Sequence, residues 1–111
     1  MTKFYLATAF SLNMLEAGGY TVSVNTIHRD GVRNILSQGE VKSFVGHQST
    51  ADLLTTILGT EIRMNRESLS LPLAGRWSLI VAQYTGPRLM EGATELPEGA
   101  KMVFWQVYPI N

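Results

Sequence analysis

The chain has 111 residues, of which 45% are hydrophobic, and its formal net charge at pH 7 is zero. This length favours a single domain over residues 1–111, since domains typically run about 100–150 residues. The sequence contains no cysteine, which excludes disulfides and cysteine-rich zinc sites. Basic residues do not outnumber acidic ones, which disfavours a general duplex-DNA-binding protein. A zero net charge is still compatible with a pocket that contains a few local arginines.

The first twenty or so residues do not combine a basic stretch with a long apolar run, as a secretory signal does. No apolar run approaches the ~20 residues that a membrane helix needs. We therefore expect a cytoplasmic protein with no membrane partner.

The chain opens with alternating strand-like and helix-like segments. Residues 3–8 are short, aromatic and aliphatic, which is typical of a buried strand. Ser11 is a candidate N-cap for a short helix that the glycines at 18–19 end. The β-branched alternation over residues 20–25 predicts a second strand.

A second helix and a third strand follow, and then another helix start. Asp30 is a candidate cap for the helix, and residues 40–45 read as a strand. Ser49 or Thr50 can cap the next helix, whose leucine-rich apolar face ends at Gly59.

The second half of the chain is predicted to be mostly extended. Residues 61–65 and 68–73 look like short extended pieces, and residues 85–92 are turn-rich. Residues 76–84 are apolar on both faces, which suits a central strand, and residues 101–108 form the last strand. We therefore predict an α/β domain with a mixed sheet of about five strands flanked by helices.

His47 stands where a strand passes into a helix. Free backbone N–H groups and the helix dipole favour anions at such a corner, and imidazole can give or take a proton near neutral pH. A lone histidine at a helix start more often only shapes the turn, so both interpretations stay open.

Arginine and hydroxyl side chains elsewhere could add phosphate contacts. Arg66 and Arg88 offer planar forks for phosphate oxygens, and Glu91 lies three residues past Arg88. Ser11 and Asn13 lie at another strand-to-helix junction. Each also has an ordinary role as a solvated or capping residue. Neither histidine lies in a metal-ligand pattern, so we expect no metal.

Four segments, taken in order, carry a resemblance to a known family. They are AFSLNML at 9–15, GHQSTADLL at 46–54, LGTEIRMNR at 58–66 and RLMEG at 88–92. Together they resemble the viral ring nuclease family, the type III anti-CRISPR enzymes that degrade cyclic tetra-adenylate. The resemblance implies a small α/β domain in a symmetric homodimer, with the cyclic second messenger bound across the dimer axis and no cofactor.

The resemblance also assigns roles to individual residues. His47 would protonate the departing 5′ oxygen while a ribose 2′-hydroxyl attacks the phosphorus in line. Arg88 and Glu91 match the family's second catalytic cluster. The product implied is linear di-adenylate with a 2′,3′-cyclic phosphate. The ligand-binding positions implied are Thr8, Ser11, Asn13, Gly46, Gln48, Ser49, Thr50 and Arg66.

Two departures from the family pattern leave alternatives open. Ala7 and Thr8 stand where relatives carry threonine and asparagine, and residues 94–100 replace a further helix. The pocket could therefore hold a cyclic nucleotide as a sponge without rapid cleavage. A nucleic-acid-binding or scaffold dimer, in which His47 is structural, is the third hypothesis.

Overall fold

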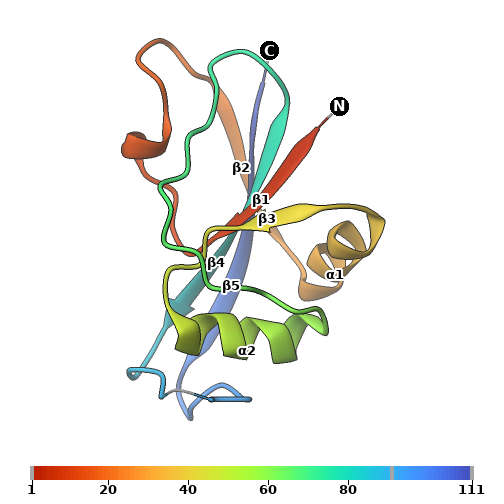
Figure 1. Ribbon diagram of the computed structural model, residues 1–111, viewed down its shortest axis with the longest axis vertical. Coiled ribbons are helices and arrows are strands. Elements are labelled where there is room, and N and C mark those ends of the chain that lie inside the picture. The colour runs from red at the N-terminus through yellow and green to blue at the C-terminus, as the bar shows by residue number, and fades with distance from the viewer. Residues whose placement is uncertain (1, 91, 111) are drawn as a thin grey trace.

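The computed structural model describes residues 2–90 and 92–110, which form a five-stranded mixed sheet with two helices (Figure 1). The strand order is β2-β5-β4-β1-β3. The strands are β1 Lys3–Ala7, β2 Val22–Ile27, β3 Val41–Ser43, β4 Trp77–Thr85 and β5 Lys101–Pro109; the helices are α1 Arg29–Gln38 and α2 Gln48–Leu58, with one 3₁₀ turn, η1, at Leu12–Met14. The predicted α/β class and mixed five-stranded sheet are confirmed.

The central strand of the sheet is β4, as its apolar sequence predicted. It pairs in parallel with β1 and antiparallel with β5, and its first six residues are all buried. A strand that packs on both faces needs apolar side chains on both, which is why this segment shows no alternation.

Three parallel strands end at one edge of the sheet, which we call the carboxyl edge. Leu6 of β1 pairs with Ser43 of β3, and Ala7 pairs with Val81 of β4. The residues that follow β1, β3 and β4 therefore leave the sheet on the same side, which is where α/β sheets bind ligands.

Each face of the sheet has its own apolar core. On one face, Leu6 and Ile80 pack with Val32 of α1 and Leu54 of α2. On the other, Leu79 packs among side chains contributed by two irregular segments, residues 8–21 and 60–76. Figure 1 shows both helices close together, while residues 8–21 and the later part of segment 60–76 run along the sheet away from α1.

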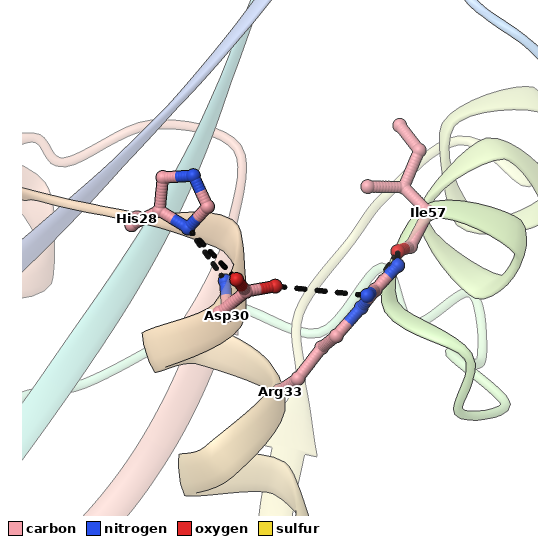
Figure 2. A network of polar contacts seen from close by, with 4 residues as sticks. All are labelled: His28, Asp30, Arg33 and Ile57. Carbon is pink, nitrogen blue, oxygen red and sulfur yellow. Dashed lines mark hydrogen bonds and ion pairs between the residues drawn. The ribbon is translucent and has the colours of Figure 1, made fainter.

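His28 is the N-cap residue of α1. It is exposed, but its Nδ1 accepts a hydrogen bond of 3.1 Å from the Asp30 backbone N–H (Figure 2). The prediction that Asp30 caps this helix is therefore wrong, because Asp30 already lies in the first turn. There its carboxylate still suits the positive end of the helix dipole.

Arg33 joins the two helices. Its Nε donates to the backbone carbonyl of Ile57, near the end of α2, at 3.1 Å (Figure 2). The last carbonyls of a helix lack partners within the helix and carry the negative end of the dipole, so a guanidinium stabilises them. Gly59 then ends α2 in the left-handed conformation, as predicted, with φ of 69°.

The short helix predicted from Ser11 is reduced to the single turn η1. The Ser11 side chain makes no capping hydrogen bond. The chain instead pairs with residues far along the sequence: Leu15 bridges Leu71, and the Leu71 N–H donates to the Met14 carbonyl at 2.7 Å. This long-range pairing takes the backbone groups that a longer helix would have used.

Candidate functional site

The corner between β3 and α2 is tied to the end of β1. The Phe44 N–H donates to the Leu6 carbonyl at 2.7 Å, which extends the parallel pairing past β3. The Val45 N–H donates to the Ser43 hydroxyl oxygen at 3.2 Å. Val45 is fully buried, so its side chain anchors the corner in the helix-side core.

His47 is the N-cap residue of α2. Its carbonyl accepts the first helical hydrogen bond, from the Ala51 N–H at 3.0 Å, whereas its side chain makes no capping hydrogen bond. The prediction that Ser49 or Thr50 caps this helix is wrong, since both lie in its first turn. The exposed imidazole therefore lies at the positive end of α2, near N–H groups that have no partner within the helix.

Arg66 reaches the same corner because the chain returns after α2. Met64 forms a parallel bridge with Val45, and the Asn65 N–H donates to the Val45 carbonyl at 2.8 Å. One residue on, the Arg66 Nε donates to the Gly46 carbonyl at 3.1 Å. The structure thus brings the arginine to the residue that precedes His47.

Of the three predicted ligand contacts after β1, Thr8 alone directly follows the strand at the carboxyl edge. Ser11 precedes η1 and is exposed. Asn13 lies within η1, whose Met14 packs in the core on the face opposite the helices. Within one chain, the segment that carries Asn13 is therefore separated from the α2 side of the sheet.

Arg88 lies on the segment that connects β4 to β5. This segment leaves from the carboxyl edge, because β4 runs parallel to β1 and continues to Thr85, past the Ala7 register position. Arg88 is exposed. Its predicted catalytic partner, Glu91, lies outside the described residues.

A groove of about 800 Å³ runs along α2 from Gln48, the residue after His47. Gln48, Asp52 and Thr56 form its α2 side, while segments 61–64 and 92–94 complete the lining. Its size falls within the ~300–1,000 Å³ range of small-molecule sites.

Two of the charged groups that line this groove, Glu61 and Arg63, are exposed and form an ion pair with each other. The Arg63 Nε donates a hydrogen bond to Glu61 Oε1 at 2.8 Å, and this bond, followed by the negative charge of the carboxylate, raises the pKa of the Arg63 guanidinium above its ordinary value. Among residues 2–90 and 92–110, no three acidic, histidine or cysteine side chains gather as metal ligands. In the same ranges, no helix combines the length and apolar character needed to cross a bilayer.

Two supporting side-chain hydrogen bonds were not predicted from the sequence. The Asn65 Nδ2 donates to the Ser43 carbonyl at 2.9 Å, which holds the returning chain against the corner. The Gln48 Nε2 donates to Asp52 Oδ1 at 2.8 Å. The second contact has a sequence signal, since residues four apart on a helix are neighbours; the first spans 22 positions and has none.

Comparison with known proteins places this fold among viral relatives. A model of the STIV B116-like family matches residues 4–101. The structure is similar to B116 of Sulfolobus turreted icosahedral virus, with a TM-score of 0.77 and 25% identity, over 95% of this chain and 97% of that one. The search of curated proteins gave no match.

Proposed function

The chain belongs to the STIV B116-like family, and we propose that it is a metal-independent ring nuclease that cleaves cyclic tetra-adenylate. The products are linear di-adenylates that end in a 2′,3′-cyclic phosphate. Removal of this second messenger switches off type III CRISPR effectors. The choice of substrate rests on the four-segment resemblance, and the proposed mechanism rests on the residues at the corner that carries His47.

The observation that carries the proposal is the meeting of His47 and Arg66 at one helix start. The imidazole is exposed and makes no capping hydrogen bond, and the arginine is fixed to the adjacent Gly46 carbonyl through Nε. The two terminal guanidinium nitrogens, which can donate a pair of hydrogen bonds to phosphate oxygens, are not used in that bond. A phosphate at this corner also meets the free N–H groups of α2.

The reaction needs little more than alignment and one proton donor. The ribose 2′ oxygen attacks the adjacent phosphorus, the new O2′–P bond forms and the P–O5′ bond breaks. The proton of the 2′-hydroxyl leaves to solvent, and protonated His47 gives its proton to the departing 5′ oxygen. Arg66 and the helix N–H groups stabilise the charge on the pentavalent phosphorus.

A symmetric homodimer is part of the proposal. A ring of four identical nucleotides can be two-fold symmetric, and an isologous dimer presents the same corner twice around its axis. Two subunits would bring two copies of His47 and of Arg66 to one ring. This also explains how a chain with zero net charge could bind a ligand with four phosphates.

Product analysis in the presence of a chelator tests this function. Purified protein is incubated with cyclic tetra-adenylate and excess EDTA, and the products are identified by mass spectrometry. We expect linear adenylates with cyclic phosphate ends. Recovery of the intact ring after many hours, with no bound ligand, would contradict the proposal.

A second function, ligand storage without rapid turnover, is favoured by one observation. Arg88 is exposed on the β4–β5 connection and makes no side-chain hydrogen bond or ion pair with the corner within the described residues. If the ring binds tightly and is recovered uncut from the protein, the chain is a sponge. Salt-sensitive duplex binding would instead favour the scaffold hypothesis.

A further inference from the structure

The groove along α2 differs in charge from the corner beside it. Its lining contains two carboxylates, Asp52 and Glu61, and the guanidinium of Arg63, which Glu61 already engages. Among residues 2–90 and 92–110, the other polar side chains of the lining are one amide and several hydroxyls. A phosphate is repelled by such a lining, whereas an uncharged base edge with donors and acceptors is well matched to it.

One amide in this groove is oriented by a hydrogen bond to its own helix. Gln48 and Asp52 lie one turn apart on α2, and the Gln48 Nε2 donates to Asp52 Oδ1 at 2.8 Å. A carboxylate can only accept hydrogen bonds, so the NH₂ group of the amide must face Asp52. The second N–H of Gln48 and its Oε1 then remain for a ligand, in a defined arrangement.

That arrangement matches an adenine. A glutamine amide can accept from the adenine N6 amino group and donate to N7 at the same time. Hypoxanthine carries an oxygen acceptor in place of the N6 amine, so the same amide orientation sets two acceptors against each other. Because Gln48 follows His47 directly, a base read here belongs to a nucleotide whose phosphate can lie at the corner.

One wall of the groove, segment 61–64, is hydrogen-bonded to α2. The Thr55 hydroxyl donates to the Ala51 carbonyl at 2.8 Å and accepts from the Ile62 N–H at 2.9 Å. This pins segment 61–64, which carries Arg63, at a fixed place beside the helix. The position of the groove relative to Gln48 is therefore set by the fold.

We propose that Gln48 reads the adenine base of the cyclic substrate in this groove, and that Asp52 is the positioning residue that fixes its amide. This inference rests on the proposed function, since it concerns the same ligand. It makes the base preference of the protein depend on a residue that need not touch the ligand.

The test compares cyclic tetra-adenylate with cyclic tetra-inosinate. We expect the unaltered protein to prefer adenylate by about tenfold to hundredfold in kcat/KM, the range of one bidentate base contact. Asp52→Asn lets the amide flip, so this ratio falls towards one while kcat for adenylate is largely kept. Gln48→Ala loses the preference through a raised KM, and thermal melting of both variants shows whether they are folded.

The matched control is Glu61→Gln, which removes a carboxylate from the same groove without touching Gln48. It should keep the adenine preference. An unchanged ratio in Asp52→Asn, or an equal loss in Glu61→Gln, overturns the reading of the base by Gln48 but leaves ring cleavage intact. Failure of the unaltered protein to cut or bind either ring overturns the proposed function and this inference together.

Discussion

At the scale of single residues, Arg66 is held to the corner by one of its three nitrogens. The Nε donates to the Gly46 carbonyl, and a ligand phosphate can take the other two. Arg66→Ala should therefore weaken binding of cyclic tetra-adenylate by about tenfold to hundredfold, as expected for hydrogen bonds to a charged group. Arg66→Lys keeps the positive charge but loses the paired guanidinium N–H donors. Its affinity should therefore lie between that of the unaltered protein and that of Arg66→Ala.

Equilibrium binding measured by calorimetry checks this order, with His47→Ala used for all arms so that the ring stays intact. If Arg66→Ala binds as tightly as the parent, the assignment of a phosphate contact to this residue is wrong.

Gly86 shows a local constraint at the start of the β4–β5 connection. Its φ is 152°, and a Cβ built there would lie 2.7 Å from the Cβ of Ala100 and 2.9 Å from its Cα. Gly86→Ala should therefore destabilise the fold by on the order of 1–3 kcal/mol, through backbone strain and a forced separation of the two ends of the connection. Urea unfolding measures this cost.

The control for that substitution is Gly39→Ala. Gly39 has an extended φ of −179°, and a Cβ there would meet nothing within 4 Å. Equal stability losses in the two variants would contradict the steric explanation.

At the scale of elements, α2 is joined to the returning chain by the Thr55 hydroxyl. Thr55→Val keeps the shape but removes the acceptor for the Ile62 N–H, which is 2.9 Å away in a partly buried place. We expect a loss of about 1–3 kcal/mol, the cost of an unsatisfied buried donor. Thr56→Val is the matched control, since the exposed Thr56 hydroxyl donates to the Asp52 carbonyl of its own helix. If thermal unfolding shifts equally in both variants, the Thr55 link is not what stabilises this segment.

The repeating elements could be predicted from the sequence because burial imposes a pattern on them. The five strands lie within a few residues of their predicted positions, and α2 ends at Gly59 as its glycine indicated. Helix starts were less predictable, because several side chains compete for the same N–H groups. Histidines took the N-cap positions of both helices, where serine, threonine or aspartate were expected. The helix expected after Ser11 gave way to pairing with Leu71, which no local pattern reveals.

At the scale of the whole molecule, only part of the candidate site could be predicted. Thr8 and His47 follow parallel strands, so their shared edge is a consequence of topology that the α/β alternation already implied. The approach of Arg66 depends on the Asn65 side chain and on a bridge between Val45 and Met64, both of which join distant positions. The relation of Arg88 to the corner depends on a long irregular connection, whose course composition alone does not determine.

The proposed dimer makes a separate prediction about the whole molecule. A ring bound at equivalent corners of two subunits needs an assembly of twice the 12.3 kDa chain mass. Analytical ultracentrifugation should find this mass in the presence of cyclic tetra-adenylate. A ligand-saturated monomer would rule out binding across a two-fold axis.

The role of His47 as the proton donor of a ring nuclease is tested most directly by replacing each of the two histidines with alanine in a separate variant. Single-turnover cleavage of cyclic tetra-adenylate is measured for His47→Ala and His28→Ala, together with ligand affinity and thermal stability. His28 only caps α1, so its loss should lower stability by about 0.5–2 kcal/mol and leave the rate unchanged. His47→Ala should bind the ring normally and cleave it about 10²–10⁴-fold more slowly. Cleavage by His47→Ala at the rate of the unaltered protein would contradict the account.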